Sequence, residues 1–170
     1  MNSDYVSGYV ALIGRPNTGK STLLNRLVGQ KVSITSRRPQ TTRHRIIGIK
    51  TDAQAQVMYV DTPGLHKSEG GMMSRYLNRA ASGSLEGVDC VLLLISSNGW
   101  KDEDEQALAH AQRQTVPVIL VINKIDKLKD PSRLLPLIEQ SRAKMHFAEI
   151  IPVSAQTGAG VQDLETCLRR

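Results

Sequence analysis

Residues 14–21, GRPNTGKS, hold two glycines, a lysine and a serine in the spacing G-x-x-x-x-G-K-[ST]. In a loop of this kind the backbone N–H groups, together with those of a following helix, converge on one place and can bind phosphate oxygens. Lys20 can reach the β- and γ-phosphates, and the Ser21 hydroxyl can coordinate Mg²⁺. The predicted phosphate-binding residues are Asn17, Thr18, Gly19, Lys20, Ser21 and Thr22.

Asp61 and Gly64 belong to the sequence DTPG, which directly follows an apolar segment. A carboxylate at the end of a strand can hold Mg²⁺ through water, and a glycine N–H beside it can contact a γ-phosphate. Taken alone, the four residues would also make an ordinary turn. Because a phosphate-binding loop precedes them, we predict the metal role for Asp61.

Asn123, Lys124 and Asp126 belong to the sequence NKID, at the end of another apolar segment. An aspartate there can accept hydrogen bonds from guanine N1–H and the 2-amino group, and adenine has neither donor. A site built for such hydrogen bonds rejects an analogue that lacks them by about 10⁴-fold. The stem of Lys124 can lie across the base, and Asn123 can tie its loop to the phosphate side.

A third segment, SAQ, follows the last apolar stretch, and a backbone N–H presented by its small residues can contact guanine O6. This signal is weak alone and gains weight only from its place after the other motifs. The predicted guanine-binding residues are Asn123, Lys124, Asp126, Ser154, Ala155 and Gln156.

The segments that must carry these residues alternate between apolar strands and helices. Strands are predicted at 8–13, 46–49, 57–60, 88–95, 116–122 and 150–153, and helices at 22–28, 73–82, 102–114, 132–144 and 161–170. Residues 46–60 predict an antiparallel hairpin. The expected fold is therefore α/β: a three-layer P-loop NTPase sandwich whose mostly parallel six-stranded sheet has one antiparallel edge strand. In such sheets ligands bind at the carboxyl ends of the strands, where all the motifs fall.

Composition limits the function classes. A chain of 170 residues suits one domain, and its net charge of +6 favours an anionic partner only weakly. Two distant cysteines, Cys90 and Cys167, cannot form a disulfide framework or a zinc site, which favours a reducing compartment. The apolar runs have strand length, so we expect no membrane span. His110 and His146 are predicted to be surface residues of helices.

The motifs occur in the order found in the translation-factor-related P-loop GTPases, which this chain resembles. Three segments, GRPNxGKST, PQTTRHR and DTPGLH, are similar to those of the Era family of bacterial GTPases. The resemblance covers residues 8–170. Thr18 departs from it, because the family more often has a small apolar residue such as valine there. That departure leaves the nucleotide exchange rate and the packing beneath the loop open.

The resemblance implies further roles. Thr42 would complete the Mg²⁺ shell in the GTP state, with the adjacent Thr41 as the alternative. Asn17 resembles the asparagine with which some relatives hold K⁺, and Leu65 stands where many GTPases carry a water-orienting glutamine. We therefore expect slow hydrolysis that K⁺ stimulates. The implied catalytic residues are Lys20, Thr42, Asn17 and Gly64, and the implied metal ligands are Ser21, Thr42 and Asp61 for Mg²⁺ and Asn17 for K⁺.

As a member of this family, the chain would be a GTP-binding and GTP-hydrolysing switch in 16S rRNA processing and small (30S) ribosomal subunit biogenesis. Family members continue into a KH-type RNA-binding domain, which residues 1–170 do not include. We therefore expect a monomeric, cytoplasmic GTPase domain that does not recognise RNA by itself, with peripheral inner-membrane association as a further option. Two alternatives stay open: a P-loop phosphotransferase or ATPase, and a basic RNA-binding module built on the arginine-rich residues 30–45.

Overall fold

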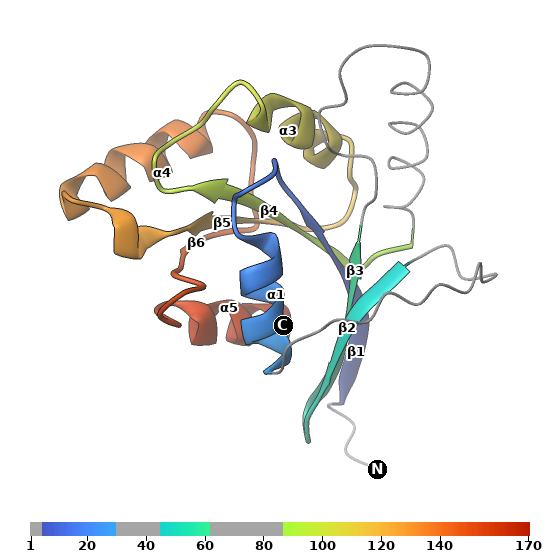
Figure 1. Ribbon diagram of the computed structural model, residues 1–170. Coiled ribbons are helices and arrows are strands. Elements are labelled where there is room, and N and C mark those ends of the chain that lie inside the picture. The colour runs from blue at the N-terminus through green and yellow to red at the C-terminus, as the bar shows by residue number, and fades with distance from the viewer. Residues whose placement is uncertain (1–4, 30–44, 62–86) are drawn as a thin grey trace.

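The computed structural model describes residues 5–29, 45–61 and 87–170. Six strands of these residues form one sheet in the order β2-β3-β1-β4-β5-β6, and only β2 and β3 pair antiparallel. The predicted fold class is confirmed, including the antiparallel edge strand (Figure 1). The strands are β1 (Val6–Ile13), β2 (Arg45–Thr51), β3 (Ala55–Asp61), β4 (Cys90–Ser96), β5 (Val118–Asn123) and β6 (Glu149–Pro152).

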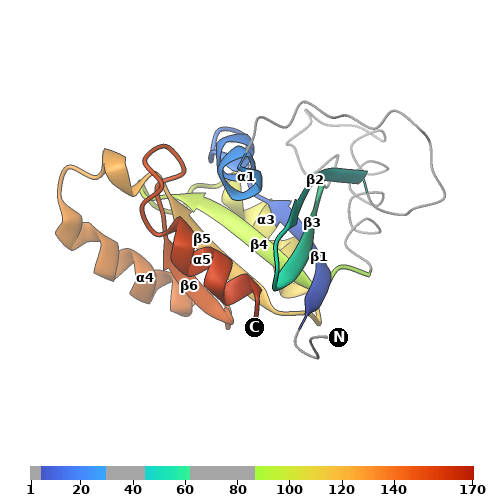
Figure 2. The same ribbon diagram turned by 90° about the horizontal axis from the view of Figure 1, so that it is seen from below.

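Helices cover both faces of the sheet, with α1 (Lys20–Val28) and α5 (Val161–Leu168) on one face and α3 (Asp104–Gln112) and α4 (Leu134–Arg142) on the other (Figures 1 and 2). Because side chains alternate along a strand, β1 supplies two cores. Val10 and Leu12 pack in the cluster that contains α1 and α5, and Ala11 and Ile13 pack in the cluster that contains α3 and α4. Two short 3-10 helices, η1 (Ile125–Lys127) and η2 (Pro131–Arg133), complete the described elements.

The helix after the phosphate loop forms because its leucines share one face. Leu23, Leu24 and Leu27 are buried at helical spacing. The helix ends at Gly29, whose left-handed backbone (φ 80°) lets its N–H donate to the carbonyl of Asn25. It begins at Lys20, two residues earlier than predicted.

Several sequence-based expectations differ from the structure. The helix predicted at 132–144 starts as η2 and becomes α-helical only over α4. His110 is buried, with 6% of its surface exposed, because it shares a helix face with Ala107; the prediction of a surface position was wrong. That burial lowers the pKa of the His110 imidazole. His146 is exposed but lies outside any helix. The helix predicted at 73–82 falls outside the described residues.

Among residues 5–29, 45–61 and 87–170, no helix combines the length and the apolar character that crossing a membrane requires.

The β2–β3 hairpin is joined to α5 and to the residue that follows it by two ion pairs. Lys50 Nζ lies 2.9 Å from Glu165 Oε1, and Arg169 Nη2 lies 2.6 Å from Asp52 Oδ2. The other oxygen of Asp52 accepts the backbone N–H groups of Gln54 and Ala55 at 2.8 and 2.9 Å, which closes the turn. These contacts, the Gln54 N–H foremost, lower the pKa of Asp52 below its ordinary 3.8.

Replacing Asp52 by asparagine is expected to destabilise the fold at pH 7 more than at pH 3. A carboxyl whose pKa is lowered by folding stabilises the native state above its unfolded pKa, and this contribution is lost as the pH falls through the folded value. Urea unfolding of the wild type and Asp52→Asn at both pH values measures the difference. Asp102→Asn, at an exposed aspartate, is the control. An equal loss at both pH values would contradict the expectation.

Candidate nucleotide-binding site

The phosphate loop connects the end of β1 to the start of α1. Gly19 lies at the junction with a left-handed backbone (φ 94°), and a Cβ added there would collide with Asn123 Nδ2, so no other residue fits. Gly19 provides no side-chain cap, and the first hydrogen bond of the helix runs from Leu23 N–H to the Gly19 carbonyl. In general, the N–H groups of a helix's first turn have no carbonyl acceptor within the helix, so the N-terminus of α1 suits the binding of an anion.

Lys20 lies over this loop. Its Nζ donates to the carbonyl of Gly14 at 2.5 Å, which keeps the ammonium beside the N-terminus of α1. Ser21 and Thr22 are exposed in the first turn, and Asn17 is exposed in the loop with φ 67°. The predicted phosphate-binding residues thus share one loop and one helix turn, and the donor set suits a phosphate chain. Their individual roles stay predictions.

The structure shows why a threonine is accepted at position 18, which the sequence did not reveal. The residue is fully buried, and its Oγ1 donates to the carbonyl of Arg15 at 2.9 Å. The hydroxyl is therefore satisfied inside the loop, which explains how a threonine is accepted where the resemblance implies valine.

Asn123 joins the two halves of the site. Its side chain is buried at the end of β5; Nδ2 donates to the Thr18 carbonyl at 2.8 Å, and Oδ1 accepts from the Ala155 N–H at 3.0 Å. One amide thus connects the phosphate loop to the loop after β6. This contact agrees with the link that the sequence predicted for Asn123.

Lys124 and Asp126 follow on the same edge. Lys124, with φ 67°, sends its Nζ to the carbonyl of Asn17 at 2.5 Å, so its stem spans from the NKID segment to the phosphate loop. Ser97 Oγ donates to the Lys124 carbonyl at 2.8 Å and supports this turn. Asp126 is exposed, and its Oδ1 accepts from the buried Ser154 hydroxyl at 2.7 Å. Nothing in the sequence pattern had indicated Ser97.

The loop after β6 is tied internally around Ser154. The Ser154 N–H donates to the Ala159 carbonyl at 2.8 Å, and the Ser154 Oγ accepts from the Thr157 N–H at 3.0 Å. Ala155 is buried and Gln156 is exposed, so of these two predicted guanine-binding residues only Gln156 is open to solvent.

The remaining predicted residues are only partly placed. Asp61 is the last residue of β3, where its backbone pairs with Arg45, but its side chain is not among those described. Thr41, Thr42, Gly64 and Leu65 lie outside the described residues. Of the predicted Mg²⁺ ligands, the structure therefore describes the side chain of Ser21 alone; Ser21 is an exposed residue next to Lys20, a position that suits that role.

An ion pair between the phosphate loop and the start of α3 escaped the sequence analysis. Arg15 Nε lies 3.1 Å from Asp104 Oδ1, and the Asp104 side chain is 1% exposed. Asp104 Oδ2 also accepts the N–H of Lys101 at 2.8 Å at the start of α3. Burial raises the pKa of Asp104, against the lowering effects of the Lys101 N–H and of Arg15. The acidic first turn of α3 was the available signal, but it indicates favourable helix-dipole interactions equally well.

Comparison with known proteins gives the context. The family model described as 50S ribosome-binding GTPase matches residues 9–124. GTPase Era of Histophilus somni (strain 129Pt) is 49% identical over 162 residues, which is 95% of this chain and 54% of that protein. The chain therefore spans about half the length of the curated relatives it matches.

Two solved structures are similar in fold and sequence. A crystal structure of Era in complex with MgGDPNP and nucleotides 1506–1542 of 16S ribosomal RNA gives a TM-score of 0.80 at 39% identity, covering 97% of this chain and 56% of that one. A variant of Aquifex aeolicus Era bound to GDP and AlF4⁻ gives 0.78 at 39% identity, covering 96% and 56%.

Proposed function

The chain belongs to the family of 50S ribosome-binding GTPases and is a homologue of the Era GTPases, and from this we propose that it binds GTP and GDP with Mg²⁺ and hydrolyses GTP. The observation that carries the proposal is the buried Asn123 amide, which joins the phosphate loop to the loop of Ala155. Phosphate-binding and base-binding residues thereby form one site, as a nucleotide requires. The residues of this chain make up its GTPase domain.

Base recognition falls to Asp126. Its carboxylate is exposed at the edge of the sheet, and Ser154 holds one of its oxygens at 2.7 Å. The carboxylate accepts guanine N1–H and the 2-amino group, and the backbone N–H groups of the loop after β6 donate to O6. An adenine nucleotide would leave these partners unpaired, which disfavours an ATP-dependent phosphotransferase.

Phosphate binding and hydrolysis rest on the N-terminus of α1. Lys20 neutralises charge on the β- and γ-phosphates, while the N–H groups of residues 17–22 bind their oxygens. Ser21, Thr42 and Asp61 would hold Mg²⁺, which when bound neutralises the phosphate oxygens. Gly64 donates its N–H to the γ-phosphate. Leu65 cannot orient water, so intrinsic hydrolysis is slow.

Titration with GDP and ADP tests the proposal directly. We expect the wild type to bind GDP at least about 10⁴-fold more tightly than ADP, because ADP lacks both donors to Asp126. Equal affinities would overturn guanine recognition. If the protein binds GDP tightly but releases no phosphate from GTP, it is a nucleotide-binding module, and the proposed hydrolysis of GTP is refuted.

Potassium is expected to stimulate turnover. Asn17 is exposed on the phosphate loop, where its amide oxygen can coordinate a monovalent cation that neutralises transition-state charge. GTP turnover should be about tenfold faster or more in K⁺ than in Na⁺ at equal ionic strength, and Asn17→Ala should remove the difference. Equal rates in the two salts in the wild type would contradict the role of Asn17.

The similar proteins suggest the cellular process in which this protein acts. Because one Era structure contains nucleotides of 16S ribosomal RNA, we propose that the protein acts as a switch in 16S rRNA processing and 30S subunit biogenesis in the cytoplasm. The arginine-rich residues 30–45 are the observation that favours direct RNA binding by this chain as the second candidate. RNA binding by residues 1–170 that weakens steeply with salt would support that candidate.

A further inference from the structure

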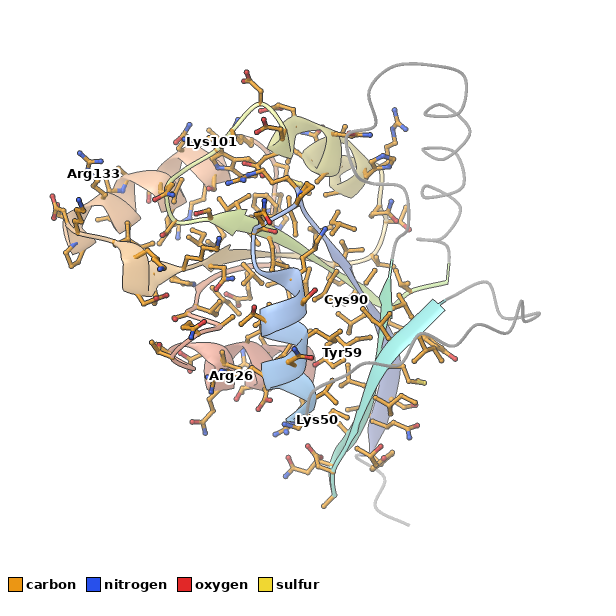
Figure 3. All side chains as sticks on the ribbon, in the orientation of Figure 1. Arg26, Lys50, Tyr59, Cys90, Lys101 and Arg133 are labelled. Carbon is orange, nitrogen blue, oxygen red and sulfur yellow. The ribbon has the colours of Figure 1, made fainter. Side chains whose placement is uncertain are left out.

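Arg26 contacts the loop between β6 and α5, which carries the predicted guanine-binding residues Ala155 and Gln156. It lies in the last turn of α1, and its guanidinium donates from Nε to the Ala155 carbonyl at 2.7 Å and from Nη2 to the Gln156 carbonyl at 2.8 Å. Figure 3 shows it on the side of α1 that faces the chain before α5. A planar guanidinium that binds two successive carbonyls holds their peptide units in a fixed orientation.

The same guanidinium also lies beside Gly158, further along the loop. Gly158 has a left-handed backbone (φ 90°), and a Cβ added there would lie 2.9 Å from Arg26 Nη1. The glycine thus leaves room for the arginine as well as allowing the turn. Although Arg26 is exposed as a residue, its guanidinium covers the loop from Ala155 to Gly158.

The geometry of the peptide unit indicates which backbone N–H of the loop is available to bind the base. In a planar trans peptide, the C=O and the N–H of one unit point in opposite directions. The Ala155 carbonyl points to Arg26, so the Gln156 N–H of the same unit points away from α1. The neighbouring Ala155 N–H already donates to Asn123 Oδ1 at 3.0 Å. The Gln156 N–H is therefore the better-placed donor for a base.

We infer that Arg26 is a positioning residue for guanine specificity: it holds the peptide between Ala155 and Gln156 so that the Gln156 N–H meets guanine O6. The inference rests on the proposed function, because it needs a guanine nucleotide beside Asp126. It also gives α1 two tasks. The N-terminus of the helix binds phosphate, and its last turn sets the loop that reads the base, so one rigid element fixes the distance between them.

The test compares GDP with 6-thio-GDP, which keeps N1–H and the 2-amino group but replaces O6 by a poorly accepting sulfur. Arg26→Ala should bind GDP about tenfold more weakly than the wild type, because charge-assisted hydrogen bonds orient the O6 donor. Its affinity for 6-thio-GDP should change less than about threefold. Arg26→Lys can keep one of the two bonds and should lie between. Arg113→Ala, at an exposed arginine directly after α3, is the matched control and should match the wild type.

The ratio of the two affinities separates positioning from simple support of the fold. If Arg26→Ala weakens GDP and 6-thio-GDP equally, or weakens neither, the positioning role is overturned. Thermal unfolding of each variant shows whether the loop change has spread to the whole domain. A wild type that fails to prefer GDP over ADP would instead refute the proposed function, whatever Arg26 does.

Discussion

Asn123→Ala is expected to lower the affinity for GDP at least about 100-fold and to lower the stability of the nucleotide-free protein as well. The amide bridges the phosphate loop and the Ala155 loop, and both of its partners, Thr18 and Ala155, are buried. Without it, the two binding loops are no longer held relative to each other. Ordering them when the nucleotide binds then costs free energy, which lowers the affinity.

The size of the effect follows from burial. Alanine would leave the Thr18 carbonyl and the Ala155 N–H without their side-chain partner in a site where the residues are 0% and 3% exposed. An unsatisfied buried polar group costs about 1–3 kcal/mol, so the free energy of unfolding should fall by about 2–6 kcal/mol. That is a large part of the total stability of a typical domain.

Urea unfolding without nucleotide and calorimetric titration with GDP measure the two effects separately. Asn98→Ala removes the same amide from an exposed loop near the site and should change both quantities little. If Asn123→Ala binds GDP within threefold of the wild type, the two loops are positioned independently, and the bridging role is wrong.

The fold was predictable because it depends on local patterns. Continuous apolar runs such as residues 118–122 indicate strands buried on both faces, and the helices between them require parallel crossovers. The edge hairpin followed from the polar turn at residues 51–54. The motifs were predictable for the same reason, because each follows directly on a strand and the carboxyl ends of parallel strands meet at one edge.

What escaped prediction are contacts between residues far apart in sequence. Arg26 and Ala155 are 129 positions apart, and no local pattern marks an exposed helical arginine as the partner of a distant carbonyl. Arg15 and Asp104 likewise meet only because the phosphate loop lies over the start of α3. His110 was misplaced because its polarity outweighed its position one turn from the buried Ala107. Spacing along the chain does not encode such pairings.

Asp126→Asn is expected to exchange guanine for xanthine specificity. The Ser154 hydroxyl, 2.7 Å from Asp126 Oδ1, can donate equally to an amide oxygen, so the side chain should keep its place. The amide NH₂ would then face the N1–H and 2-amino group of guanine, donor against donor. Xanthine has a carbonyl at position 2 and can accept from that NH₂.

Affinities for GDP and XDP measure the exchange. GDP should weaken by about 10²–10⁴-fold, since the loss of a paired polar contact at a specificity site has this magnitude, and XDP should become the tighter ligand. Asp163→Asn removes the same charge from an exposed position in the first turn of α5 and should leave the preference for GDP intact. A weakening of both nucleotides in Asp126→Asn would mean that Asp126 supports the loop rather than reading the base.

The two nucleotides also separate Asp126 from Arg26. Asp126 reads positions 1 and 2 of the ring, whereas the Gln156 N–H, held through Arg26, is proposed to read position 6, where guanine and xanthine both carry oxygen. Arg26→Ala should therefore weaken XDP binding to Asp126→Asn about as much as it weakens GDP binding to the wild type. We expect this because the two residues contact different members of the loop, Ser154 for Asp126 and the carbonyls of Ala155 and Gln156 for Arg26, and would read different positions of the base.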